Sequence, residues 1–536
     1  MSVDTNNAAF QDALNLIQYT RQSVFLTGKA GTGKSTFLRY VCEHTKKKHV
    51  VLAPTGIAAI NAGGSTMHSF FKLPFYPLLP DDPNLSLQRG RIHEFFKYTK
   101  PHRKLLEQIE LVIIDEISMV RADLIDAIDR ILRVYSHNLR EPFGGKQLLL
   151  VGDVFQLEPV VKNDEREILN RAYPTPYFFS ARVFSQIDLV SIELQKVYRQ
   201  TDSVFVSVLD HIRTNTAGAA DLQLLNTRYG SHIEESEADM YITLATRRDT
   251  VDSINEKKLA ELAGEPITFE GSIEGDFPES SLPTSQELVL KPGAQIIFIK
   301  NDFDRRWVNG TIGVIAGIDE EEETIYVITD DGKECDVKRE SWRNIRYRYN
   351  EKTKEIEEEV LGSFTQYPIR LAWAITVHKS QGLTFSRVVI DFTGGVFAGG
   401  QAYVALSRCP SLDGIQLKKP INRADIFVRP EIVNFAGRFN DRQAIDKALK
   451  QAQADVQYAA AARAFDKGDM EECLEQFFRA IHSRYDIEKP VPRRLIRLKL
   501  GIINTLQEQN KKLKEQMREQ QERLRQYAHE YLLMGN

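Results

Sequence analysis

One glycine-rich segment has the residue types and spacing of a phosphate-binding loop. An apolar run at residues 23–27 precedes it and predicts a buried strand, and residues 36–41 have the spacing of a helix. Between a strand and a helix, such a loop surrounds phosphates with backbone N–H groups. We expect Lys34 to contact the β- and γ-phosphates and Ser35 to bind Mg²⁺. The segment therefore predicts a nucleoside triphosphate site whose contacts come from Gly28, Ala30, Gly31, Thr32, Gly33, Lys34, Ser35 and Thr36.

Carboxylates suited to hydrolysis follow a second apolar run. Residues 111–114 predict a central parallel strand, and Asp115 and Glu116 come directly after it. An isolated Asp-Glu pair is usually solvated surface charge, but a pair at a strand end downstream of a phosphate loop favours catalysis. We expect Asp115 to hold Mg²⁺ through water and Glu116 to orient or deprotonate the attacking water. Gln156, beyond another apolar run at 147–151, can sense the γ-phosphate.

The α/β pattern resumes beyond residue 190 without a second phosphate loop. Apolar runs at 189–192, 241–244 and 388–390 predict further strands. Two α/β units with one nucleotide segment suggest a site at their interface, with the second unit supplying cations. Arg199 and Arg408 are the candidate arginine fingers, although any single arginine is more often a surface residue.

Taken together and in order, the motifs resemble those of the Pif1-like branch of superfamily 1B DNA helicases, with RecD-like proteins as near relatives. The matching segments extend over about three-quarters of the chain and are GKAGTGKST (28–36), APTGIAAINAGGSTMHSFF (53–71), IIDEISM (113–119), PFGGKQLLLVGDVFQLEPV (142–160), YRQ (198–200), AWAITVHKSQGLTF (372–385) and YVALSR (403–408).

The resemblance implies two RecA-like motor domains that hydrolyse ATP and move 5′-to-3′ on single-stranded DNA. It implies that Gln156 is the γ-phosphate sensor, that Arg199 and Arg408 are paired fingers, and that Gln11 reads adenine. Glu158 departs from the family, which usually has proline there. DNA contacts are implied for Thr55, His68, Phe70, Thr376, His378 and Lys379, with the alternative that Phe70 or its neighbour Phe71 is core.

Two stretches read as insertions. In residues 72–104, Pro74, Pro77, Pro80 and Pro83 argue against regular structure, and the resemblance implies a small wedge that splits the duplex. Short apolar runs within residues 286–362 predict strands joined by polar turns. We interpret this second stretch as an SH3-like β-barrel. The expected α/β fold is thus a first motor domain at 1–190 and a second at 191–440, each with its insertion.

The C-terminal segment falls outside the family pattern. Residues 441–490 predict a helical hairpin similar to one tetratricopeptide unit, and 491–536 predict a coiled-coil-like helix. From residue 489 the tail has 11 basic and 5 acidic residues. An intermolecular coiled coil and a helix folded back on the motor are equal alternatives. The heptads have Ile503, Asn510, Met517, Leu524 and Tyr531 at position a, and Leu506, Leu513, Gln520, Tyr527 and Met534 at position d.

Composition narrows the functional classes. The net charge of −4, from 70 basic and 74 acidic residues, excludes a uniformly basic coat protein but allows a local cationic channel. The four separate cysteines predict reduced thiols in a cytoplasmic protein. For a DNA helicase, as the resemblance implies, we expect association with the nucleoid. We expect ATP and Mg²⁺ as cofactors, single-stranded and tailed duplex DNA as partners, no membrane association, and a role in genome maintenance. The alternatives are a translocase that does not separate strands and a nucleotide-switched coiled-coil scaffold.

Overall fold

The computed structural model describes residues 4, 7–86, 91–198, 202–230, 240–304, 306–350, 352–353, 355–484 and 490–534. The chain consists of two compact units, Met1–Ala448 and Leu449–Asn536. The first unit contains two parallel sheets and three antiparallel ones, and the second is helical. No helix in the described residues has the length and apolar character needed to cross a membrane.

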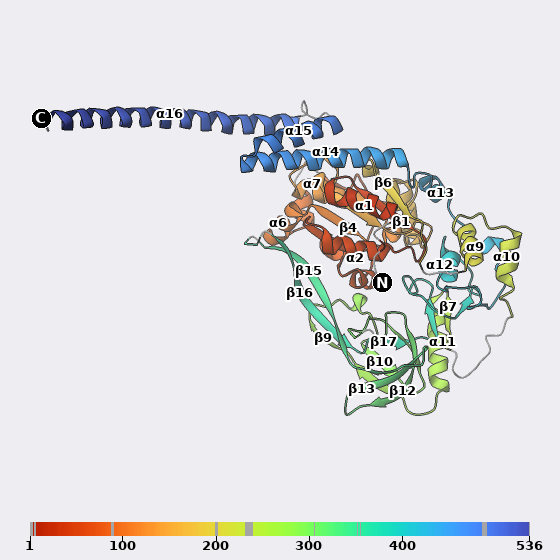
Figure 1. The fold of residues 1–536 in the computed structure, drawn as a ribbon. Helices are drawn as coiled ribbons and strands as arrows, with labels where there is room; N and C mark the ends of the chain where they lie inside the picture. Colours follow the sequence, from red (N-terminus) through yellow and green to blue (C-terminus); the bar gives the residue numbers. More distant parts are fainter. Residues whose placement is uncertain are drawn as a thin grey trace. The chain divides into compact units, whose positions relative to one another are not determined.

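A six-stranded parallel sheet forms the centre of the part expected to be the first motor domain, and we keep the names first and second motor domain for the two parts (Figure 1). All side chains of its central strands are buried, because helices cover the sheet on both faces. In spatial order the strands are β3 (Ser65–Thr66), β2 (His49–Ala53), β4 (Leu111–Ile114), β5 (Gln147–Val151), β1 (Val24–Gly28) and β6 (Val190–Leu194). The helices of this part are α1 (Ala8–Tyr19), α2 (Lys34–His44), α3 (Gly56–Ala62), α4 (Met67–Phe71), α7 (Ala122–Tyr135) and α8 (Asn163–Asn170).

Strand β6 corrects the predicted limit at residue 190. Val24–Gly28 pairs along its whole length with Val190–Leu194, so this strand completes the first sheet. The apolar run at 189–192 was therefore wrongly attributed to the second motor domain. Sequence periodicity identifies a strand but not the sheet that it joins.

The insertion at 72–104 is more regular than its prolines suggest. It contains a 3-10 turn at Pro83–Leu85, helix α5 (Arg91–Phe95) and the start of α6 (Lys100–Gln108). Pro83 and Pro101 stand in the first turns of helical segments, where a missing N–H costs no hydrogen bond. The expectation of irregular structure was wrong for these segments.

The second motor domain has a four-stranded parallel sheet. Its spatial order is β18 (Ala374–Thr376), β7 (Ile242–Ala245), β19 (Val388–Asp391) and β20 (Ile415–Leu417). The predicted runs at 241–244 and 388–390 are thus strands of one sheet. The helices around it are α9 (Ser203–Arg213), α10 (Ala219–Asn226), α11 (Arg248–Glu261) and α12 (Gln401–Leu406).

Antiparallel strands occupy the stretch between β7 and β18. A five-stranded sheet has the order β14 (Glu334–Val337), β13 (Thr324–Thr329), β12 (Ile312–Asp319), β11 (Gln295–Phe298) and β17 (Ile369–Leu371). A long hairpin of β15 (Glu340–Asn350) and β16 (Glu355–Gln366) pairs with β9 (Ser272–Gly275), and β8 (Ile267–Glu270) pairs with β10 (Glu287–Leu290). Strands β11, β12 and β13 lie within the stretch 286–362, where short strands were expected.

The chain returns to the first motor domain after the second sheet. Helix α13 (Pro430–Ala436) packs there, with the rings of Phe435 and Phe439 centred 5.6 and 5.7 Å from that of Phe25 in β1. The predicted limit of the second motor domain at 440 is therefore too late. The remaining helices are α14 (Arg442–Lys467), α15 (Met470–Ser483) and α16 (Pro490–Met534). Helices α14 and α15 contact each other, with the rings of Tyr458 and Phe477 centred 5.9 Å apart.

Candidate functional site

The phosphate loop closes around the Lys34 ammonium. Lys34 Nζ donates to the carbonyl oxygens of Gly28 at 2.7 Å and Lys29 at 3.0 Å. Gly31 and Gly33 have φ of 80° and 88°, a left-handed conformation that L side chains rarely adopt. A Cβ on Gly28 would lie 2.7 Å from the Leu194 carbonyl oxygen, so only glycine fits. The loop is therefore built from its glycines for close backbone approach to an anion.

The rest of the predicted nucleotide segment lies around this loop. Thr32 Oγ1 donates to the Lys29 carbonyl at 2.9 Å, and Ala30 is buried. Ser35 and Thr36 are in the first turn of α2, where the free N–H groups favour negative charge, and Ser35 is exposed. These residues therefore lie at the N-terminal end of α2, where free backbone N–H groups can bind a phosphate group.

The acidic pair lies at the carboxyl end of β4. Asp115 Oδ1 accepts a hydrogen bond of 2.9 Å from the Glu116 N–H, and Glu116 has the left-handed φ of 49°. Burial raises the pKa of the Asp115 carboxyl. Burial, together with the negative charge of Asp115, raises the pKa of Glu116 to about 7, against the lowering effect of Lys34 and Arg408. Glu116 is thus poised to accept a proton near neutral pH.

The same residues fit Mg²⁺. Hard divalent cations prefer oxygen ligands. Ser35, in the first turn of α2, provides a hydroxyl, and Asp115, just after β4 and within the influence of the Lys34 charge, provides a carboxylate. Burial raises the pKa of Asp115 by more than the Lys34 charge and the Glu116 N–H lower it, so more positive charge is needed to keep this carboxylate ionised. A cation bound with the nucleotide would supply that charge.

Gln156 belongs to a buried polar group that sequence reasoning found only in part. Its Nε2 donates to Asp153 Oδ2 at 3.4 Å, and its Oε1 accepts from Gln381 Nε2 of the second motor domain at 3.5 Å. Arg213 of α9 donates to Asp153 at 3.0 Å and forms a 2.9 Å ion pair with Glu193. Arg213 was missed because it lies in an ordinary helix sequence, sixty residues from Asp153.

The second motor domain contacts the phosphate loop directly through α12. The Ala30 N–H donates to Tyr403 Oη at 3.0 Å. Arg408, five residues later, is 1% exposed and donates to the carbonyls of Val404, at 2.9 Å, and Ser380, at 3.2 Å. Its charge lowers the pKa of Glu116. Arg408 therefore acts electrostatically on the Glu116 carboxylate from the opposite domain.

The other predicted finger, Arg199, lies outside the described residues. The chain just before it crosses the loop, because the Tyr198 N–H donates to the Gly31 carbonyl at 2.9 Å. Gln11 is in α1, whose neighbouring Phe10 packs edge-on against Phe37 of α2, with ring centres 4.8 Å apart. That contact fixes α1 beside the phosphate loop's helix, and the adenine role of Gln11 stays a prediction.

The predicted DNA-contact residues of the first motor domain divide into core and surface. Phe70 is 4% exposed and packs edge-on against Phe71, so its assignment as a stacking surface was wrong. Thr55 is exposed and caps α3. His68 is half-buried and lies parallel to Phe75, with ring centres 4.9 Å apart, and Phe75 is 81% exposed. Phe75, which sequence reasoning missed, offers the free aromatic face there.

The second motor domain also has a predicted DNA-contact histidine stacked on an exposed phenylalanine. His378 lies parallel to the exposed ring of Phe397, 6.5 Å between centres. Thr376 accepts a 3.2 Å hydrogen bond from the Lys379 N–H. Burial and the nearby charges of other basic side chains lower the pKa of Lys379, and burial lowers that of His378. The Lys379 ammonium, close to Arg370 and Arg248, is suited to pair with a phosphate.

Glu158, the departure from the family pattern, has a structural explanation. It forms a 2.8 Å ion pair with Arg429 and accepts a 2.9 Å hydrogen bond from Tyr177 Oη. The carboxylate therefore connects the loop after β5 to the segment that returns before α13.

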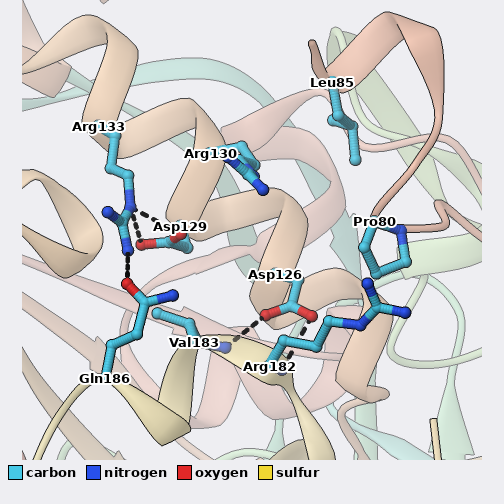
Figure 2. Close-up of a pocket in the computed structure, with 9 residues that line it drawn as sticks. All are labelled: Pro80, Leu85, Asp126, Asp129, Arg130, Arg133, Arg182, Val183 and Gln186. Carbon is cyan, nitrogen blue, oxygen red and sulfur yellow. Dashed lines mark hydrogen bonds and ion pairs between the residues drawn. The ribbon is translucent and has the colours of Figure 1, made fainter. Parts of the chain in front are cut away.

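A separate pocket of about 130 Å³ lies beside α7 and is lined in part by the insertion residues Pro80 and Leu85 (Figure 2). Its carboxylates are already satisfied: Asp126 accepts from the N–H groups of Arg182 and Val183, both at 3.0 Å. Asp129 pairs with Arg133 at 2.8 Å. The pocket therefore holds structural polar contacts and is distinct from the nucleotide site.

The chain is similar to known proteins in both sequence and structure. A family model described as PIF1-like helicase matches residues 4–217. The ATP-dependent DNA helicase Pif1 of Bdellovibrio bacteriovorus is 31% identical over 439 residues, covering 80% of this chain and 90% of the relative. The crystal structure of Bacteroides sp Pif1 in complex with ADP-AlF4 has a TM-score of 0.73 and 41% identity, covering 80% and 96%. Bacteroides Pif1 bound to ssDNA has a TM-score of 0.59 and 40% identity, covering 83% and 99%.

Proposed function

Because the chain belongs to the PIF1-like helicase family, we propose that this ATP-dependent DNA helicase translocates 5′-to-3′ on single-stranded DNA and unwinds duplexes with a 5′ tail. One observation carries the proposal: residues from both motor domains meet at the phosphate loop, where the Ala30 N–H contacts Tyr403 Oη. A nucleotide bound there touches both domains, so its hydrolysis can change how they pack. The relatives bound to ADP-AlF4 and to ssDNA support the same assignment.

In the hydrolysis step, the chain positions the nucleotide and the attacking water. Lys34 stabilises the β- and γ-phosphates, while Ser35 and Asp115 would hold Mg²⁺, which neutralises phosphate charge when bound. Glu116 accepts the proton of the attacking water, and its raised pKa suits it to that role. Arg408 stabilises the negative charge that develops on the transferred phosphoryl group.

Loss of the γ-phosphate is then transmitted between the domains. Gln156 is hydrogen-bonded to Asp153 in the first domain and to Gln381 in the second. A γ-phosphate that forms a hydrogen bond with Gln156 would therefore change both contacts. Each domain also has an exposed phenylalanine stacked on a predicted DNA-contact histidine, Phe75 and Phe397. Opening and closing of the domains would move the DNA contacts at Phe75 and at Phe397 alternately along one DNA strand.

Three further assignments belong to this proposal. The insertion of residues 72–104 acts as the wedge that separates the strands. The five-stranded antiparallel sheet is the centre of an SH3-like barrel that covers the DNA. The protein works in genome maintenance, in the cytoplasm at the nucleoid.

Polarity is tested with matched substrates. Two duplexes of identical sequence, one with a 5′ and one with a 3′ single-stranded tail, are incubated with protein and ATP, and strand separation is followed by fluorescence. The proposal expects unwinding of the 5′-tailed duplex and none above the Lys34→Ala background for the 3′-tailed one. Unwinding of only the 3′-tailed duplex would overturn the polarity, and ATP-dependent displacement of a bound protein without strand separation would indicate a translocase.

A further inference from the structure

Helix α16 carries a long apolar stripe that no other described part of its own helical unit covers. The side chains from residue 504 to 534 are all exposed. Seven of them, at heptad positions a and d, are large and apolar, and they are Leu506, Leu513, Met517, Leu524, Tyr527, Tyr531 and Met534, with exposed fractions from 54% to 86%. The helix over this span is about 46 Å long at 1.5 Å per residue.

Such a helix needs a partner for its stability. Most of the stability of protein helices comes from packing of an apolar face, and isolated helices are marginal in water. A repeat of seven residues keeps the a and d positions on one side over several turns, which is the pattern of a supercoiled pair. The stripe is therefore too regular and too long for scattered surface apolar residues.

We propose that residues 503–534 form a parallel two-stranded coiled coil with the same helix of a second copy of this chain. This proposal goes beyond the helicase activity and does not depend on it. The charges allow self-association: across a parallel pair, the flanking positions bring Gln509 near Lys514, Gln516 near Gln521, and Arg523 near Ala528. None of these pairs places like charges together.

The polar positions of the stripe select the parallel direction. In parallel register, Asn510 faces Asn510 and Gln520 faces Gln520, so each amide can hydrogen-bond its copy. The antiparallel alignment that joins the same span sets Gln520 opposite Met517. A side-chain amide packed against an apolar group loses water without gaining a partner, which disfavours that arrangement.

The mass of the full chain in solution tests the association. The full chain is loaded at concentrations from about 1 to about 50 μM, so that a dimer with a micromolar dissociation constant is detected. Light scattering after size exclusion is expected to give twice the monomer mass of 61.2 kDa. The double variant Leu513→Lys/Leu524→Lys is expected to run as a monomer. Its matched control, Asn504→Lys/Gln526→Lys, adds the same two charges outside the stripe and is expected to remain a dimer. A monomeric wild type over the whole range, or equal masses for the variant and its control, overturns the proposal.

Cross-linking tests the direction. In a parallel pair the two Asn510→Cys thiols are adjacent, so mild oxidation is expected to give a covalent dimer on a non-reducing gel. Lys511→Cys, one position away and outside the stripe, controls for random collision and for the native thiols. Cross-linking of Asn510→Cys no greater than that of Lys511→Cys overturns the parallel arrangement. Circular dichroism of each variant confirms that its helix content is kept.

Discussion

Replacement of Glu116 by glutamine should raise the stability of the folded protein and at the same time lower its ATP turnover. The Glu116 carboxyl is buried beside Asp115, and both effects raise its pKa from 4.5 to about 7. A pKa that is higher in the folded than in the unfolded state means that the protonated form favours folding. That contribution is fully present below pH 4.5 and is lost as the pH rises through about 7. At pH 8 the folded protein therefore holds an unfavourable negative charge.

The size of the effect follows from the two pKa values. Linkage gives a cost of about 3 kcal/mol at pH 8 and about 1 kcal/mol at pH 5 for a pKa moved from 4.5 to about 7. Glutamine has nearly the same shape and no charge, so Glu116→Gln should stabilise the nucleotide-free protein by these amounts. The same change removes the proton acceptor and should lower ATP turnover by about 100-fold or more.

Thermal unfolding of wild type and Glu116→Gln at pH 5 and pH 8, without nucleotide, measures this prediction. We expect a higher Tm for the variant at both pH values and a difference about threefold larger at pH 8. Glu94→Gln, at an exposed position of α5, is the matched control and should leave Tm unchanged. A variant that is less stable than wild type at pH 8, or a difference that does not depend on pH, would refute the reasoning.

Three other substitutions test separate parts of the structure. Asp129→Ala removes the partner of the buried Arg133 and should lower stability by about 3 kcal/mol in urea unfolding, whereas a loss below about 1 kcal/mol would contradict the buried ion pair. Arg213→Ala leaves the buried Asp153 without its cation, so we expect a similar loss of stability; an unchanged urea midpoint would show that the pair contributes nothing. Phe75→Ala should weaken binding of fluorescent oligo(dT) by about 1–3 kcal/mol if a base stacks on that ring, with Tm unchanged, and equal affinity would exclude stacking.

The nucleotide site could be predicted from sequence because its chemistry is local. A glycine-rich loop between a strand and a helix leaves little freedom, and the positions of Lys34, Ser35 and Thr36 in the structure agree with that pattern. Asp115 and Glu116 follow from the rule that parallel strands end at one edge of a sheet.

Pairing between distant segments could not be predicted from sequence. Strand β6 has an ordinary apolar pattern, and only its pairing with β1 assigns it to the first sheet. A motif identifies an aromatic residue but does not tell whether its ring is exposed or buried. The ring of Phe70 is buried in the core, although the motif suggested an exposed stacking surface. Arg213 reaches Asp153 through tertiary packing, for which no sequence spacing gives a signal.

The central claim is that ATP hydrolysis in the site between the motor domains is coupled to DNA. Steady-state ATP turnover of the full chain with and without single-stranded oligo(dT) tests it most directly, with Lys34→Ala as the blank. We expect single-stranded DNA to raise turnover by about tenfold or more, because DNA held by both domains favours the closed site in which residues of the second domain reach the nucleotide. Equal turnover with and without DNA, both above the Lys34→Ala blank, would contradict the account and favour a nucleotide-switched scaffold.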